Sequence, residues 1–171
     1  MSRFLIIGYS GSGKSTLARE ISYLTSIPYF DSDSLYWDSE WNLISDDEVV
    51  AKLPLSDDSW ILDGNFVSHR DQVWSRATTI IWVNPPLIKG MFRLIKRNLG
   101  LWISRRPSWS GSRMPLNIAI SGIVHGWKRR RKDQSNFTQF ISEYPDKLIF
   151  KIQTRSDYET LLASIHQLDD K

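Results

Sequence analysis

A short glycine-rich segment near the start of the chain holds the residues best suited to chemistry. Residues 8–15 read GYSGSGKS and match G-x-x-x-x-G-K-[ST], the pattern of a phosphate-binding loop, or P-loop. In such a loop the glycines let backbone N–H groups point at phosphate oxygens, and the next helix adds the positive end of its dipole. We expect Lys14 to reach the β- and γ-phosphates of a nucleotide and the Ser15 hydroxyl to ligate Mg²⁺.

The segments on either side of this loop are the elements that it needs. Residues 3–7 (RFLII) form an apolar run typical of a buried parallel strand, and residues 16–21 (TLAREI) form a good start to a helix. A glycine-rich turn with a chance lysine is the alternative. The order of strand, loop and helix favours the phosphate site.

Strands and helices alternate along the rest of the chain. We expect further strands at residues 28–31, 60–63, 78–83 and 147–152, and helices at 14–24, 46–53, 87–99, from 116 into the basic run at 128–132, and at 156–167. Ser45 with Glu48 is a predicted capping box, and Ser156 is a predicted N-cap. Residues 100–115 mix Gly, Pro, Ser and Arg and are predicted to form a mobile insertion. The alternation indicates a mainly parallel sheet covered on both faces.

Polar residues follow the first three predicted strands. The P-loop follows the first, Asp31-Ser32-Asp33 the second, and Asp63-Gly64-Asn65 the third. In open parallel sheets, ligands bind outside the carboxyl ends of the strands. We therefore expect these three clusters to share one site. A solvated turn at Asp31 and Asp33, and a simple capping role for Asp63, are the alternatives.

The length and composition of the chain limit the classes of protein to which it can belong. The chain has 171 residues and no cysteine, which fits one domain without disulfides or thiolate chemistry. We see no leader pattern and no apolar run long enough for a bilayer, and we expect a cytoplasmic protein. The three histidines are scattered and predict no zinc site.

Charge is distributed unevenly along the chain, although the net charge is only +3. Between Asp31 and Asp63 the only basic residue is Lys52, whereas residues 72–132 contain no Asp or Glu. Such asymmetry indicates an anionic partner for the second half, either nucleotide phosphates or a nucleic-acid backbone. The run at 128–132 also fits a solvated helix end.

These motifs together resemble a known group of enzymes. The chain is similar to small P-loop kinases of the adenylate kinase and shikimate kinase type, and most similar to adenylate-kinase-related proteins labelled DNA topology modulation proteins. The resemblance rests on the P-loop, on residues 30–37 (FDSDSLYW) with Trp41, on residues 60–66 (WILDGNF) with Arg70, and on Arg93-x-x-x-Arg97. It implies a three-layer P-loop NTPase fold in a single domain over residues 1–171. This fold has a mainly five-stranded parallel sheet with helices on both faces, and a lid insertion at about 100–115.

The resemblance also implies roles for individual residues. Asp31 and Asp33 resemble an Asp-x-Asp pair, with Asp31 near the Mg²⁺ waters and Asp33 at the acceptor hydroxyl, while Asp63 supports Mg²⁺. The nucleotide-binding residues would be Gly8, Ser10, Gly11, Ser12, Gly13, Lys14, Ser15, Thr16, Arg93 and Arg97. The acceptor-binding residues would be Asp33, Trp37, Asp63, Gly64, Asn65 and Arg70. The catalytic residues would be Lys14, Asp33, Arg97, Arg105 and Arg106, and the metal-binding residues Ser15, Asp31 and Asp63.

Several of these residues have plainer interpretations. Arg93 and Arg97 are spaced i, i+4 and fit a solvated helix face, and Trp37 and Trp41 fit core positions. An adenylate kinase has Asp-Gly-Phe-Pro-Arg where this chain has Asp63-Gly64-Asn65-Phe66, a departure that argues against AMP as acceptor.

The predicted function is an ATP- and Mg²⁺-dependent kinase that phosphorylates a nucleotide, a nucleoside or a small hydroxylated metabolite. We expect ATP and this small acceptor as its partners, and no membrane association. A nucleic-acid-associated ATPase, and a nucleotide-binding regulator with little turnover, are the alternatives. A GTP-reading Asn/Thr-Lys-x-Asp motif is absent, which favours ATP as donor.

Overall fold

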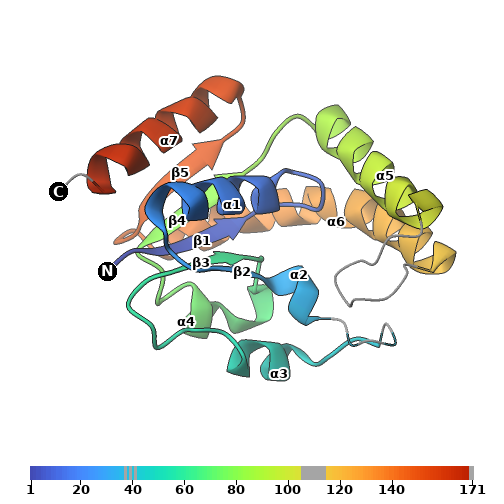
Figure 1. The fold of residues 1–171 in the computed structure, drawn as a ribbon, viewed down its shortest axis with the longest axis horizontal. Helices are drawn as coiled ribbons and strands as arrows, with labels where there is room; N and C mark the ends of the chain where they lie inside the picture. Colours follow the sequence, from blue (N-terminus) through green and yellow to red (C-terminus); the bar gives the residue numbers. More distant parts are fainter. Residues whose placement is uncertain (37, 39, 41, 105–114, 170–171) are drawn as a thin grey trace.

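The structure is a computed structural model, and it describes residues 1–36, 38, 40, 42–104 and 115–169. The described part is an α/β structure with one five-stranded sheet (Figure 1). Its strands are β1 (Arg3–Ile7), β2 (Tyr29–Asp31), β3 (Trp60–Asp63), β4 (Thr79–Val83) and β5 (Leu148–Ile152). Its helices are α1 (Lys14–Thr25), α2 (Ser32–Leu35), α3 (Asp46–Ala51), the 3₁₀ turn η1 (Val67–His69), α4 (Arg70–Val73), α5 (Leu87–Ser104), α6 (Leu116–Ser142) and α7 (Arg155–Asp169).

The sheet has the order β2-β3-β1-β4-β5, and every neighbouring pair is parallel. The central strand β1 is therefore flanked by β3 and β4, and all five carboxyl ends lie at one edge. The residues of β3 and β4 are all buried, as expected for apolar strands that are covered on both faces. The predicted five-stranded parallel sheet is confirmed.

Two apolar cores lie on opposite faces of this sheet and make the three layers. On one face, Phe4, Ile6 and Ile61 pack with α1 and α7. On the other face, Leu5, Leu62 and Trp82 pack with residues of α3, with Trp74 and with the C-terminal part of α6. Figure 1 shows α1 and α7 together in front of the sheet and α6 behind it. Burial of both faces holds β1, and with it the P-loop, in a fixed position.

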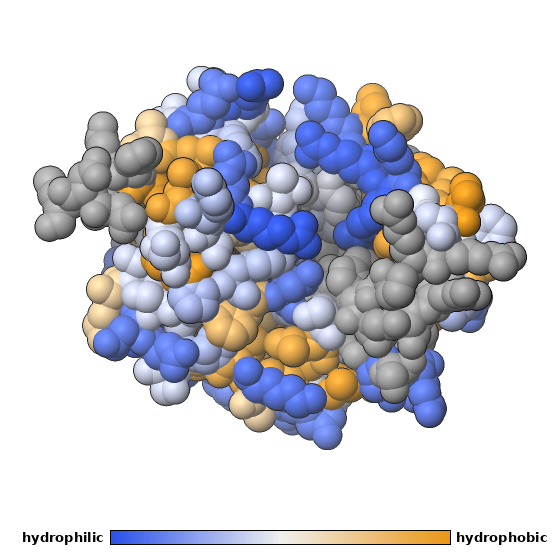
Figure 2. Space-filling view, in the orientation of Figure 1, coloured by the Kyte–Doolittle hydropathy of each residue, from blue (hydrophilic) through white to orange (hydrophobic). Residues whose placement is uncertain are grey.

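Helix α5 extends beyond its predicted end at residue 99. It continues through Gly100 to Ser104. Leu101-Trp102-Ile103 are adequate helix residues, and a single exposed glycine costs only about 1 kcal/mol in a helix. Along this helix Met91 and Leu94 are buried, whereas Ile95 and Leu99 are exposed. Figure 2 shows hydrophobic surface over this outer part of the molecule.

The helix starts combine one confirmed cap with one correction. Ser45 and Glu48 form the predicted capping box at α3. At α7 the predicted cap Ser156 is wrong, because the helix already includes Arg155. Thr154 is the capping residue: its Oγ1 accepts from the N–H of Asp157 at 3.2 Å, and its own N–H donates to Asp157 Oδ2 at 2.9 Å. Helices α2, η1 and α4 were not predicted. In the described part of the chain, no helix is long and apolar enough to cross a membrane.

Candidate active site

The P-loop joins β1 to α1, and its glycines adopt conformations that other residues avoid. Gly8, Gly11 and Gly13 have φ values of 150°, 83° and 106°. A Cβ at Gly8 would lie 2.4 Å from the carbonyl oxygen of Val83, and one at Gly11 would lie 2.5 Å from that of Gly90. Glycine is therefore required at both positions by conformation and by space.

Tyr9 anchors this loop to the segment that follows β4, a contact that the sequence did not reveal. Its hydroxyl donates to the carbonyl oxygen of Pro85 at 2.7 Å, and its side chain is buried. Its ring lies against Gly90 of α5, where a Cβ would come within 2.4 Å of the ring. The P-loop and the beginning of α5 are thus packed together without space between them.

Lys14 points along the loop toward the end of β3. Its Nζ lies 3.4 Å from the carbonyl oxygen of Tyr9 and 3.9 Å from Asp63 Oδ1. The side chains are 12% and 4% exposed, respectively, so this ion pair is shielded from water. A cation held between the loop and a carboxylate lies where nucleotide phosphates would enter a P-loop.

The strand ends come together as the sequence predicts. Asp63 is the register partner of both Ile6 in β1 and Asp31 in β2, so the two aspartates are neighbours in adjacent strands. Asn65 Oδ1 accepts from the backbone N–H of Gly8 at 2.9 Å, which ties the end of β3 to the P-loop. The Ser32 hydroxyl donates to the carbonyl oxygen of Asp63. A Cβ at Gly64 would lie 2.2 Å from that hydroxyl oxygen, so this packing requires glycine.

Tyr29 is a further residue of this site that the sequence analysis missed. Its hydroxyl donates to Asp63 Oδ2 at 3.4 Å. Burial, followed by the charges of Asp63 and Asp31, raises the pKa of Tyr29 well above its usual value. The signal was present in the sequence, because Tyr29 precedes Asp31 by two positions and therefore shares its face of β2.

The residues present fit a nucleotide together with a magnesium ion. Ser15, Asp31 and Asp63 offer the oxygen ligands that Mg²⁺ prefers. The described residues contain no group of three or more His, Cys, Asp or Glu that could hold a metal without other ligands. Mg²⁺ is typically held by one or two carboxylates together with substrate phosphates, a role that Asp31 and Asp63 could fill. In addition, the buried Ser12 Oγ has no hydrogen-bond partner among the described atoms.

The two arginines of α5 have different surroundings. Arg93 Nη1 donates to the carbonyl oxygen of Ser12 at 3.4 Å, so this exposed side chain reaches the P-loop. Arg97 Nε donates to the side-chain oxygen of Asn98 at 3.2 Å. Arg93 therefore has a direct contact with the loop.

Arg70 lies against α6 and its C-terminal end. Its guanidinium is 3.6 Å from the centre of the Phe140 ring, and Nη2 is 3.4 Å from Glu143 Oε2. Among the described residues, these two contacts join Arg70 to the C-terminal end of α6. The structure thus places Arg70 in a packing contact with the core that includes Trp74 and Phe140.

Some predicted site residues cannot be placed in the same way. Asp33 belongs to α2, but its side chain lies outside the description. Trp37, Trp41, Arg105 and Arg106 lie outside the described residues, as does the rest of the predicted lid from 105 to 114.

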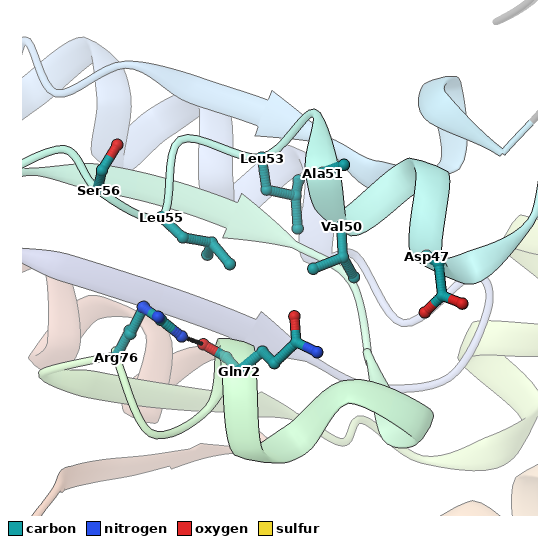
Figure 3. A pocket seen from close by; sticks show the side chains of 8 residues that line it. All are labelled: Asp47, Val50, Ala51, Leu53, Leu55, Ser56, Gln72 and Arg76. Atoms are coloured by element: carbon teal, nitrogen blue, oxygen red, sulfur yellow. Dashed lines mark hydrogen bonds between the residues drawn. The ribbon is translucent and has the colours of Figure 1, made fainter.

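A hollow of about 500 Å³ lies between α3 and the end of α4 (Figure 3). None of the predicted site residues lines it. Its lining combines apolar side chains with Arg76, which donates to the carbonyl oxygen of Gln72 at 2.6 Å. The lining residues are Asp47, Val50, Ala51, Leu53, Leu55, Ser56, Gln72 and Arg76.

Comparison with known proteins gives matches to solved structures but not to protein families or curated sequences. No protein family and no curated protein matches the sequence. Solved structures do match, among them a gluconokinase from Sinorhizobium meliloti 1021, with a TM-score of 0.53 over 99% of this chain and 94% of that one. At 16% sequence identity this likeness concerns the fold. Taken with the sheet order and the P-loop, it shows that the chain has the three-layer fold of a P-loop kinase.

Proposed function

We propose that this protein is an ATP-dependent phosphotransferase that moves the γ-phosphoryl group of ATP to a small acceptor. The observation that carries the proposal is the convergence of the P-loop with two acidic strand ends, in which Lys14 Nζ lies 3.9 Å from Asp63 Oδ1. A P-loop by itself would serve any nucleotide-binding protein. The neighbouring Asp31 and Asp63 add the oxygen ligands that a magnesium–nucleotide needs.

Each residue has a part in this reaction. Phosphoryl transfer needs mainly alignment, charge neutralisation and exclusion of water. Lys14 and the loop N–H groups would neutralise the β- and γ-phosphates, and Arg93 would add charge from the side of α5. Mg²⁺, when bound by Ser15 and the phosphates, would supply further electrostatic stabilisation. Arg97, Arg105 and Arg106 remain proposed contributors from α5 and the lid.

We assign the acceptor to a chemical class and not to a single compound. Asp33 is proposed to orient an acceptor hydroxyl, which favours a nucleoside or a hydroxylated metabolite. The structural likeness to a gluconokinase makes sugar acids such as gluconate part of that class. The finer resemblance to topology modulation proteins has no support from the comparisons and stays a prediction.

The test is ATP consumption with Mg²⁺ in the presence of nucleoside monophosphates, nucleosides, gluconate and other small alcohols. We expect one acceptor to stimulate turnover, and Lys14→Ala to reduce it by at least about 100-fold through loss of phosphate stabilisation. Lys52→Ala, which removes an exposed lysine outside the site, is the matched control. Stimulation only by DNA or RNA, weakening as salt rises, would replace the kinase proposal with a nucleic-acid-associated ATPase.

A further inference from the structure

The hydroxyl of Tyr29 contacts a carboxylate that the proposed magnesium site uses. It donates to Asp63 Oδ2 at 3.4 Å. We propose that Tyr29 is a positioning residue for the magnesium–nucleotide complex, holding Asp63 in the orientation that the metal requires. This inference rests on the proposed function and extends it to a residue outside the P-loop.

The fold fixes the place of this hydroxyl. Tyr29 and Asp31 lie on the same face of β2, and their register partners on β3 are Ile61 and Asp63. The half-buried Tyr29 ring packs against the core that includes Ile61 and Leu17. The guanidinium of Arg19 lies 5.9 Å from the centre of the ring. These contacts restrict the ring, and its hydroxyl reaches the carboxylate at the end of β3.

The two oxygens of the Asp63 carboxylate have different neighbours. Tyr29 donates to Oδ2 at 3.4 Å, whereas Lys14 Nζ lies 3.9 Å from Oδ1. Because a carboxylate oxygen has two lone pairs, a carboxylate oriented by these contacts can still accept from water or bind a metal ion. Loss of the Tyr29 hydroxyl would remove one of the contacts that orient Asp63.

The contact between Tyr29 and Asp63 has a consequence that can be measured as metal affinity. Mg²⁺ demands near-ideal octahedral geometry, so it is sensitive to the orientation of each ligand. Removing a partner that orients a metal ligand costs about 10–100-fold in metal affinity. We expect Tyr29→Phe, which keeps the ring and its packing, to raise by about 10-fold the Mg²⁺ concentration needed for tight nucleotide binding. Nucleotide affinity without metal should change little, because Lys14 and the loop N–H groups remain.

A second tyrosine beside α1 provides the matched control. The Tyr158 hydroxyl donates to a carboxylate oxygen of Glu20, and its ring packs against the same core as Tyr29. Tyr158→Phe therefore removes an equivalent hydroxyl–carboxylate contact without touching Ser15 or Asp63. It should leave the Mg²⁺ dependence of nucleotide binding unchanged.

The experiment measures binding of a fluorescent ATP analogue to the full chain while Mg²⁺ is titrated. Binding of Mn²⁺ in the presence of ADP, followed by electron paramagnetic resonance, gives a second readout that needs no turnover. Thermal unfolding shows that both variants are folded. The expected result is a shift in metal dependence for Tyr29→Phe alone.

Two other results would overturn the inference. Equal Mg²⁺ dependence in wild type and Tyr29→Phe would remove the positioning role while leaving the proposed kinase intact. An equal shift in Tyr158→Phe would show a general loss of packing under α1 and would also overturn it. If wild-type protein binds no nucleotide, with or without Mg²⁺, the proposed function fails together with the inference, so the two failures are distinguishable.

Discussion

The side-chain oxygen of Asn65 accepts a hydrogen bond from the backbone N–H of Gly8 at 2.9 Å, across 57 positions of the chain. This bond joins the end of β3 to the first residue of the P-loop. The indole N–H of Trp74 donates to the carbonyl oxygen of Asn65 at 2.9 Å and holds that residue from the other side. The shape of the P-loop therefore depends on a residue that follows the third strand.

We expect Asn65→Ala to lower the free energy of unfolding by about 1–3 kcal/mol, because the N–H of Gly8 loses its acceptor. Urea denaturation measures this loss. Asn65→Asp keeps an acceptor and should be more stable than Asn65→Ala, although its charge should weaken nucleotide binding. Equal stability of wild type and Asn65→Ala would show that the bond contributes nothing to the loop.

Arg93 should contribute to nucleotide affinity, whereas another cation on the same helix should not. Arg93 Nη1 lies 3.4 Å from the carbonyl oxygen of Ser12 and is placed to meet a phosphate in the loop. We expect Arg93→Ala to weaken binding of an ATP analogue by about 10-fold. Lys96→Ala removes the same charge from an exposed position three residues away and should change binding little. Equal losses in both variants would point to long-range charge instead of a contact.

Two glycines of α5 should respond in opposite ways to alanine. At Gly90 a Cβ would lie 2.4 Å from Tyr9 Cε2, whereas at Gly100 it would meet nothing within 4 Å. We expect Gly90→Ala to destabilise the protein by about 1–3 kcal/mol through overpacking. Gly100→Ala should stabilise it by about 0.5–1 kcal/mol, since alanine is the better helix residue. Thermal unfolding of both variants checks the pair, and a stabilised Gly90→Ala would contradict the tight packing.

Tyr158 should make stability depend on pH in the alkaline range. Burial, followed by the hydrogen bond with Glu20, raises the pKa of Tyr158 in the folded protein. Its hydroxyl therefore stabilises the fold fully below the unfolded pKa of about 10, and this contribution is lost as pH rises above that value. The difference in Tm between wild type and Tyr158→Phe should shrink on going from pH 8 to pH 11, because the tyrosine ionises in the unfolded chain from about pH 10 upward. A difference that stays constant would rule out this linkage.

The sequence predicted the fold through short-range patterns that physics ties to one structure. Apolar runs such as residues 79–83 are buried strands because both faces of the sheet are covered. The shared site was predictable from Asp31 and Asp63, because the carboxyl ends of parallel strands lie at one edge. The strand order was not predictable in the same way, since it depends on contacts between distant segments.

The errors came from features that local patterns describe poorly. Gly100 was read as a break, but a glycine without tertiary conflict can remain in a helix. Ser156 was assigned as a cap, although Thr154 and Asp157 form the reciprocal pair three residues apart. The sequence also gave no sign of the contact between Arg70 and Phe140, because it joins residues 70 positions apart that no short motif connects. The roles assigned to individual site residues stay predictions.

The contact of Tyr9 with Pro85 and Gly90 has a consequence for protein engineering. P-loops are short and are readily treated as interchangeable cassettes. In this protein the loop cannot be exchanged independently of the beginning of α5. The Tyr9 ring fills the space beside Gly90, and the Tyr9 hydroxyl donates to the carbonyl oxygen of Pro85. A loop transplanted into or out of this scaffold would have to bring residues 85–90 with it. The functional module is thus made of two segments that lie more than 70 positions apart in the chain.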